Sequence, residues 1–342
     1  MTVYFDLENF KSLMLKYGGS QRGADVLRFV KNQLNVHLNF MIKNLPDDVA
    51  DLLSEFMDGV SPEFRLTHST NFIQKRPVAV ESLNDKNGIY LLDDENIESV
   101  RNTHTVFIGC PGEEVSVLEQ LIIDKNDYGF HSQRAIGSHD FDDWNKIEPY
   151  CFPFSTLVIV DRYMFKGSAT TGNLGLFDYN LGKILSKFFE HKKSLARIIV
   201  IYQIELSRNP AFPHPDPGPD FMYLKNKFKT AVNKLSKGCP VPEMFFVAVP
   251  KGTIADEHDR HIISNYIRFK SGDSLVYFSS AGTKLTMSED FDIYSLANRK
   301  YRENTAIFLD AVRKIIKDTF ALYPSRCSFE NGIAKEAIVN LN

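Results

Sequence analysis

The chain has few of the features that mark secreted, metal-bound or membrane proteins. It has four cysteines and one tryptophan among 342 residues, and no two cysteines form a CxxC pair. This dispersal favours free thiols over a disulfide framework or a zinc site. No run of about 18 apolar residues occurs, and the first residues, MTVYFDLENFK, have neither the basic flank nor the apolar stretch of a signal peptide. We therefore expect a cytoplasmic protein without a membrane span.

The composition is that of an ordinary globular protein, with 43% hydrophobic and 24% charged residues. At about 150 residues per domain, the length favours two domains. We place the boundary near residue 150, because the stretch 140–153 (DFDDWNKIEPYCFP) combines acidic residues, the tryptophan and two prolines. The sequence thus predicts an acidic, mixed α/β domain over residues 1–150 and a second domain over residues 151–342.

The formal net charge of −3 conceals two halves of opposite sign. Residues 1–150 contain 14 Lys+Arg and 24 Asp+Glu, whereas residues 151–342 contain 26 Lys+Arg and 19 Asp+Glu. A positive field raises the local concentration of a polyanion, so any polyanion would bind the C-terminal half. The acidic half is expected to recognise a protein partner or to cover the basic face. An accidental imbalance between two solvated halves is the alternative.

The N-terminal half reads as mixed α and β. The spacing of apolar residues predicts a largely helical start, with one helix over residues 23–45 and a second helix, opened by Pro46, over residues 47–57. Short strands are predicted at 88–92 and 105–109, followed by a helix over 113–124. No chemical motif stands out in this half.

Strands and helices alternate regularly after residue 155, which predicts an α/β fold with helices on both faces of a mostly parallel or mixed sheet. A β-hairpin, a terminal helix and a loosely packed tail after Tyr323 are expected to follow, and a Pro-rich surface loop over 209–219 precedes the second helix. The predicted elements are strands at 156–160, 196–202 and 244–249, helices at 181–191 and 221–237, hairpin strands at 261–269 and 274–278, and a last helix at 305–320.

His258 and Arg260 precede the predicted hairpin. In an extended chain alternate side chains share a face, so these two would project together. A guanidinium grips two phosphoryl oxygens, and an imidazole can attack phosphorus or donate a proton. Such a site needs no divalent metal, and we expect no cofactor.

The segment HDRHIISN fits the spacing H-x-[KR]-x4-[DN], a relaxed form of the H-x-K-x4-D signature of the phospholipase D superfamily. The chain resembles the single-motif members of that superfamily found in prokaryotes, many of which are nucleases or presumed nucleases. The resemblance implies a phospholipase D-like domain in which His258, Arg260 and Asn265 form the catalytic site. It also suggests a role in prokaryotic defence.

Two substitutions distinguish this site from the family pattern. Arg260 replaces a lysine, which keeps the charge, and Asn265 replaces an aspartate, which removes the carboxylate that would orient the histidine. Glu257 or Asp259 could take over that orienting role. Because the family's chemistry uses two histidines and this chain has one motif, the resemblance implies a homodimer in which both copies of His258 face each other.

Further supporting residues follow from position and from the resemblance. Asp161 and Tyr163 come directly after the strand at 156–160, where open α/β sheets bind their ligands. Capping of a turn is an equal explanation for Asp161. The segment FSSAGT, with Ser279 and Ser280, looks like the small-residue turn that lines the family's phosphate pocket.

The helix at 221–237 is rich in lysine with aromatic residues between, a pattern that suits phosphate contacts and base stacking. A solvated helix face is an equally good interpretation. The lysines in question are Lys225, Lys227, Lys229, Lys234 and Lys237.

Taken together, the sequence predicts a metal-independent phosphodiesterase, most readily a nuclease acting on DNA or RNA through a histidine nucleophile. The alternative is a non-catalytic regulatory protein whose degenerate site binds nucleic acid, a nucleotide or a protein. A phospholipase is disfavoured because no amphipathic membrane-docking segment stands out.

Overall fold

The protein is an α/β protein whose described strands form one parallel sheet and one mixed sheet. Two compact units divide the chain, one formed by residues 1–132 with 294–302 and the other by residues 133–293 with 303–342. The computed structural model describes residues 1–17, 21–43, 45–60, 64–68, 88–92, 107–109, 114–122, 131–132, 143–161, 175–190, 192, 195–203, 218–249, 260–272, 275–285 and 291–330.

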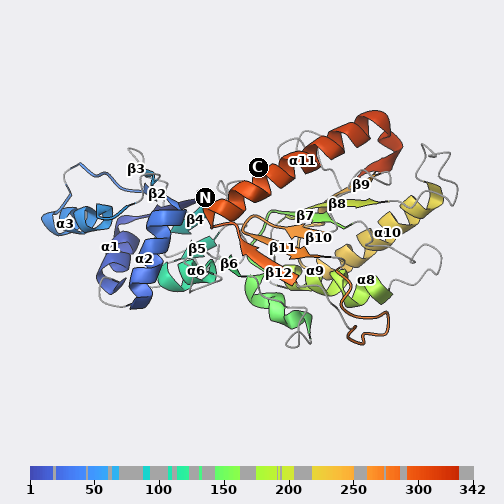
Figure 1. Cartoon of the computed structure of the whole chain (residues 1–342), viewed down its shortest axis with the longest axis horizontal. Helices are drawn as coiled ribbons and strands as arrows, with labels where there is room; N and C mark the ends of the chain where they lie inside the picture. The colour runs from blue at the N-terminus through green and yellow to red at the C-terminus, as the bar shows by residue number, and fades with distance from the viewer. Residues whose placement is uncertain are drawn as a thin grey trace. The chain divides into compact units, whose positions relative to one another are not determined.

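The first unit contains a five-stranded sheet with the strand order β3-β2-β1-β4-β5. Every neighbouring pair in it is parallel. The helices α1, α2 and α6 pack against one another (Figure 1). The elements of this part are β1 Thr2–Phe5, α1 Leu7–Tyr17, α2 Gln21–Gln33, β2 Asn35–Leu38, α3 Asp47–Met57, β3 Leu66–His68, β4 Gly88–Leu91, β5 Phe107–Gly109 and α6 Glu114–Gln120.

The prediction of a largely helical start was right only in part, because α1, α2 and α3 form but two strands, β1 and β2, lie among them. Residues 2–5 form β1, and the helix predicted over 23–45 ends at Gln33, where β2 begins two residues later. Leu34, Val36 and Leu38 are buried and alternate with less buried residues, which is the period of a strand. A spacing of four residues between Leu34 and Leu38 fits either period, and parallel pairing with β1 decides between them. The helix opened by Pro46 is confirmed as α3.

The second sheet has eight strands in the order β13-β9-β8-β7-β10-β11-β12-β6. Its central strands β7, β8 and β9 are parallel, as the sequence predicts, while β10 runs antiparallel to β7 and β13 antiparallel to β9. The remaining elements, in chain order, are β6 His131–Ser132, η1 Trp144–Tyr150, β7 Thr156–Val160, α8 Gly175–Tyr179, α9 Leu181–Phe189, β8 Arg197–Gln203, α10 Gly218–Leu235, β9 Glu243–Val249, β10 Arg260–Ile263, β11 Ile267–Ser271, β12 Phe291–Ser295, α11 Arg299–Leu322, η2 Pro324–Arg326 and β13 Cys327–Glu330.

Helices cover both faces of the second sheet. On one face, Phe228 of α10 packs edge-to-face on Phe246 of β9, with ring centroids 5.4 Å apart. On the other face, Phe308 of α11 packs on His261 of β10 at 4.5 Å. Figure 1 shows α10 and α11 on opposite sides of the parallel strands. The residues that point toward α10 and those that point toward α11 therefore alternate along each strand.

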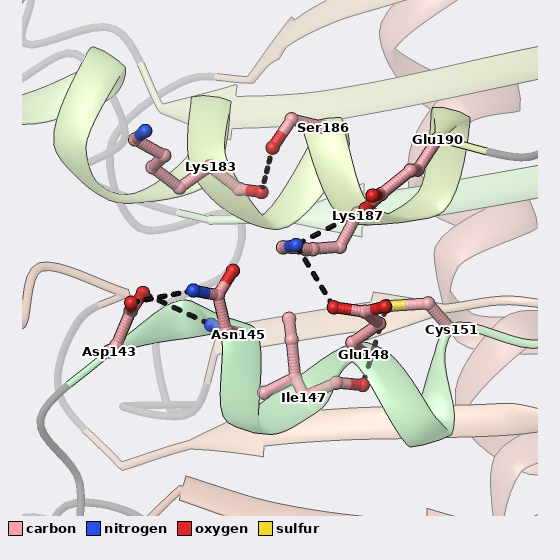
Figure 2. Close-up of polar contacts among 9 residues, drawn as sticks. All are labelled: Asp143, Asn145, Ile147, Glu148, Cys151, Lys183, Ser186, Lys187 and Glu190. Carbon is pink, nitrogen blue, oxygen red and sulfur yellow. Dashed lines mark hydrogen bonds and ion pairs between the residues drawn. The ribbon is translucent and has the colours of Figure 1, made fainter.

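The stretch before the predicted boundary at residue 150 belongs to the second unit. There η1 is fastened to α9 by Lys187, whose Nζ lies 3.0 Å from Glu148 and 3.1 Å from Glu190 (Figure 2). Asp143 caps the start of η1 by accepting a hydrogen bond from the backbone N–H of Asn145. In η1 the side chains of Trp144 and Ile147 are buried, with exposed fractions of 2% and 0%.

Two further predictions for the second unit were wrong. The hairpin strands are β10 and β11, so its turn falls at residues 264–266, inside the run that the sequence assigns to one strand. The hydroxyl of Ser264 accepts hydrogen bonds from the backbone N–H groups of Tyr266 and Ile267. These bonds stabilise a turn that begins at Ser264. The loose tail predicted after Tyr323 was wrong for residues 324–330, because β13 pairs with β9, and residues 331–342 lie outside the described residues.

Residues 209–217 of the predicted Pro-rich loop lie outside the described residues, and its last two residues, Gly218 and Pro219, belong to the first turn of α10. Proline suits that turn, since its missing N–H has no partner there in any helix. Among the residues that the structure describes, no helix is both long enough and apolar enough to span a membrane.

Candidate functional site

A row of buried polar side chains lies at the end of the central strands of the second unit, where β7 and β8 terminate. Arg260 opens β10 and stands opposite Ser271 of β11. His261 pairs with Val160, so Arg260 lies beside Asp161, and Val160 pairs with Ile201, so Asp161 lies beside Tyr202. Neighbours in register share a face of the sheet. All four side chains therefore point toward the face that α9 and α10 cover.

An ion pair forms the centre of this row. The Nε of Arg260 lies 3.3 Å from Oδ1 of Asp161, and the two side chains are 1% and 2% exposed. The backbone N–H of Asp161 donates to the carbonyl of Ile201 at 3.1 Å, which holds the carboxylate at the carboxyl end of the parallel strands. Attraction between buried charges is strong, yet each ion must give up its water. The pair is stable only while both partners are present.

Tyr202 and Ser271 were not singled out from the sequence. Both are buried, and burial raises the pKa of the Tyr202 hydroxyl, so that this group is a neutral donor. The hydroxyls of Ser271 and Tyr277 lie 3.2 Å apart. The one available signal was position, since Tyr202 and Ser271 stand at the ends of apolar strands. Whether such an end lies beside Arg260 or Asp161 depends on strand order.

Three of the predicted site residues, His258, Glu257 and Tyr163, lie outside the described residues. By sequence, His258 comes two residues before the start of β10, and Tyr163 comes two residues after Asp161. The structure thus brings Arg260 and Asp161 together, although 98 residues separate them in the chain.

Asn265 lies at the other end of β10. Its Oδ1 accepts a hydrogen bond of 2.8 Å from the backbone N–H of Ser155, and its Nδ2 donates to the Ser155 hydroxyl at 2.9 Å. Ser155 precedes β7, whereas Asp161 follows it. Asn265 therefore joins the hairpin turn to the start of β7, one strand length away from the Arg260–Asp161 pair.

The predicted small-residue turn is well ordered by its own contacts. The Ser279 hydroxyl accepts hydrogen bonds from the N–H groups of Ala281 and Thr283, whereas Ser280 is exposed. Gly282 has a φ of +79°, and a Cβ atom there would lie 2.7 Å from the ring of Tyr179. Only glycine meets both conditions without strain. The Ser279 hydroxyl is thus already used within its turn.

Asn180 fastens the start of this turn to the helices. Its Oδ1 accepts from the backbone N–H groups of Tyr277 and Phe278 at 2.8 Å each, and its Nδ2 donates to the carbonyl of Phe278 at 2.8 Å. One buried amide thereby satisfies three backbone groups of a segment without regular structure. The segment leaves the sheet at Ser271, on the same edge as Arg260.

The lysines of α10 fall into two groups. Lys225 and Lys229 both bind the carboxylate of Glu330 in β13, each at 2.6 Å. Burial acts to raise the pKa of Glu330, but hydrogen bonds from Lys225, Lys229 and Ser328 outweigh it and lower that pKa to about 2. Lys227, Lys234 and Lys237 are exposed. The basic surface of this helix is therefore smaller than its sequence indicates.

In the part of the chain that the structure describes, no group of three or more His, Cys, Asp and Glu side chains is placed to hold a metal ion. Comparison with protein-family models finds no family that matches the chain, and a search of curated proteins finds no match either.

Proposed function

We propose that this protein is a metal-independent phosphodiesterase with a phospholipase D-like second domain, and that its substrate is a nucleic acid. The observation that carries the proposal is the buried pair of Arg260 and Asp161 at the carboxyl end of the parallel strands. Open α/β sheets bind ligands at this edge. The pair also adjoins, in sequence, the histidine that the phospholipase D-like motif assigns as the nucleophile.

Asp161 would orient Arg260 before substrate binds. A guanidinium has five N–H donors in a rigid fork, and the negative charge of Asp161, 3.3 Å from its Nε, would favour one orientation of that fork. A group fixed in advance loses less entropy when it grips a phosphoryl oxygen. Because the pair is shielded from water, its interaction with developing charge on phosphorus would be stronger than on an open surface.

The proposed reaction has two steps. A ring nitrogen of His258 attacks phosphorus, a P–N bond forms, and the P–O bond to the leaving group breaks. The leaving oxygen takes its proton from His258 of the partner subunit. That second imidazole then removes a proton from water, which attacks phosphorus and releases the first histidine. The reaction needs both copies of the chain, so the proposal includes a homodimer with the two-fold axis at the site.

The test uses the full-length protein with 5′-labelled single-stranded RNA, 5′-labelled single-stranded DNA and an activated phosphodiester, all in EDTA. We expect His258→Ala to lower turnover by at least about 100-fold, because it removes the nucleophile, while nucleic-acid binding persists. His68→Ala, which removes an exposed histidine of the first unit, is the matched control. Acid-labile phosphohistidine at residue 258 should accumulate on rapid quenching.

Three results would overturn the proposal. Turnover that survives in His258→Ala assigns the activity to another group or to a contaminant. Absence of turnover on all three substrates, together with binding that His258→Ala leaves intact, favours the non-catalytic binding protein instead. A monomer in light scattering at assay concentration would remove the shared site.

A further inference from the structure

The sheet of the first unit contains a topological switch point. From β1 the chain builds outward through β2 to β3, and it then returns to the other side of β1 to form β4 and β5. All pairs are parallel, so every carboxyl end lies on one edge. At such a point the connections leave in opposite directions and open a crevice, which is where α/β sheets of this kind bind ligands.

The residue at this point is Asp6. It directly follows β1, and its backbone N–H donates to the carbonyl of Leu91, the last residue of β4, at 3.1 Å. On the other side, the backbone N–H of Asn39 donates to the carbonyl of Phe5, which extends the pairing of β1 and β2 by one residue. The Asp6 and Asn39 side chains are 4% and 3% exposed. Two buried oxygen-bearing side chains thus end adjacent strands.

Asn9 adds a third, and it is the residue that indicates a ligand. Its backbone N–H and its Nδ2 both donate to Oδ1 of Asp6, at 2.9 and 2.8 Å. The side chain is fully buried, yet its Oδ1 has no hydrogen-bond partner among the described residues. A buried acceptor without a donor destabilises the folded state, because it has given up the hydrogen bonds that water would provide. Native structures retain such groups where something else satisfies them.

Helix capping explains only part of this arrangement. Asp6 accepts the N–H of the third residue of α1, which is the ordinary contact of an N-cap aspartate. That contact needs nothing from the side chain of Asn9. The Asn9 amide is buried, and its nitrogen donates a hydrogen bond while its oxygen accepts none. Such an arrangement is unfavourable unless a cation or a hydrogen-bond donor approaches the oxygen.

We propose that Asp6 and Asn9 hold a divalent cation, Mg²⁺ or Mn²⁺, at the carboxyl ends of β1 and β4. Carboxylate and amide oxygens are the ligands that these hard cations prefer, and Mg²⁺ commonly binds through one or two carboxylates while keeping several waters. Asp6 Oδ1 and Asn9 Oδ1 are both acceptors, so an anion is disfavoured at this point. The positive end of α1 opposes a cation, but the Asp6 carboxylate offsets it.

This cation site is separate from the proposed phosphodiesterase site, which lies in the other unit and whose chemistry requires no metal. It also differs from sites built of three or more His, Cys, Asp or Glu side chains, which the described residues do not form. The metal-binding experiment can therefore support or overturn the cation site whatever the phosphodiesterase assay in EDTA shows.

The test is a titration of the full-length protein with Mn²⁺, in which the free ion is followed by its electron paramagnetic resonance signal. We expect one saturable site from which Mg²⁺ displaces Mn²⁺. Asp6→Asn should weaken Mn²⁺ binding at least about tenfold, since it removes the negative charge of the Asp6 ligand. Asp51→Asn, at an exposed position of α3, is the matched control and should leave affinity unchanged.

The variant Asn9→Asp distinguishes a role of Asn9 as a metal ligand from a purely structural role. It keeps the size of the side chain and adds a second carboxylate beside Asp6. Without metal we expect a lower melting midpoint, because two buried like charges repel, and Mn²⁺ should restore that midpoint and bind at least about fivefold more tightly than to the wild type. If Asp6→Asn does not fold, this variant decides alone.

The outcomes that overturn the proposal are plain. Wild-type protein that shows no saturable Mn²⁺ binding up to about 1 mM has no such site. Binding that Asp6→Asn leaves unchanged places the ion elsewhere. Weaker or unchanged Mn²⁺ affinity in Asn9→Asp assigns Asn9 to the architecture of the helix start.

Discussion

At the residue scale, the second unit depends on a small number of buried polar side chains. Asp161 directly follows β7, Arg260 opens the neighbouring strand β10, and the two opposite charges form an ion pair with almost no exposure. Removing one charge from such a pair leaves the second charge buried, which costs more than the pair itself contributes. Replacing both by apolar side chains of similar volume avoids that cost.

This asymmetry makes a prediction about stability. Asp161→Asn should lower the free energy of unfolding by about 3–5 kcal/mol, because Arg260 then remains charged without its carboxylate. The double variant Asp161→Leu with Arg260→Met should lose clearly less, and urea denaturation measures both. Equal losses in the single and the double variant would show that the charge pair is not the source of the effect.

At the element scale, β13 is held to the rest of the second unit by charge as well as by strand pairing. Glu330, at its end, receives hydrogen bonds from Lys225 and Lys229 of α10. The helix that the sequence marks as basic thus uses two of its lysines to secure the last strand. Phe329 of the same strand packs on Phe320 of α11, so β13 contacts elements on both faces of the sheet.

The lowered pKa of Glu330 sets a pH window. Its carboxylate stabilises the fold fully above the ordinary pKa of 4.5, and this contribution is lost as the pH falls toward about 2. Glu330→Gln should therefore cost about 1–2 kcal/mol at pH 7, a value reduced by solvent around Lys229, and nothing near pH 2.

Denaturant unfolding at several pH values measures the difference between the wild type and Glu330→Gln. Glu303→Gln, at an exposed position of α11, is the matched control. A difference that stays constant between pH 5 and about pH 2 would contradict a stabilising role for the ionised carboxylate.

At the scale of the whole molecule, opposite charge separates the two halves of the chain. The excess of Lys and Arg lies after residue 150, and the exposed lysines of α10 belong to it. If the proposed substrate is a nucleic acid, these cations release counterions when they meet phosphates, and affinity becomes dependent on salt.

Neutralising Lys227, Lys234 and Lys237 together to serine should weaken binding of single-stranded RNA or DNA. It should also reduce the slope of log affinity against log salt concentration by about 2–3, since three phosphate contacts are lost. Replacing Lys314 and Lys317, exposed on α11, by serine is the control and should leave the slope unchanged. Equal slopes in all three proteins would place the nucleic acid on another surface.

The sequence predicts most of the second unit because its strands are short, apolar and β-branched. The run TLVIV coincides with β7, and β8 and β9 lie within a residue of their predicted bounds. The alternation of these strands with helices indicates parallel pairing, because two parallel strands must be joined by a crossover connection, which is usually a helix. The position of Asp161 at a carboxyl end followed from the same reasoning and is confirmed.

The first unit was predicted less well because its strands are only three or four residues long. At that length an apolar pattern fits a helix and a strand equally, as it does around Leu34 and Leu38. For this reason the sequence did not point to Asp6 and Asn9. A residue can be recognised as following a strand only once that strand has been predicted, and β1 was not. The switch point beside β1 also requires the strand order, which no local pattern contains.

The sequence by itself determined the α/β class, the central strands of the second unit and the identity of Arg260 and Asp161 as residues of interest, since these depend on local periodicity and on residue chemistry. The tertiary structure alone decided that Arg260 meets Asp161, that Asn265 faces the opposite end of β10, and that Lys225 is neutralised by Glu330. These are contacts between segments about 100 residues apart. Strand order and register create them, and both are fixed by burial of the whole sheet rather than by any stretch of chain.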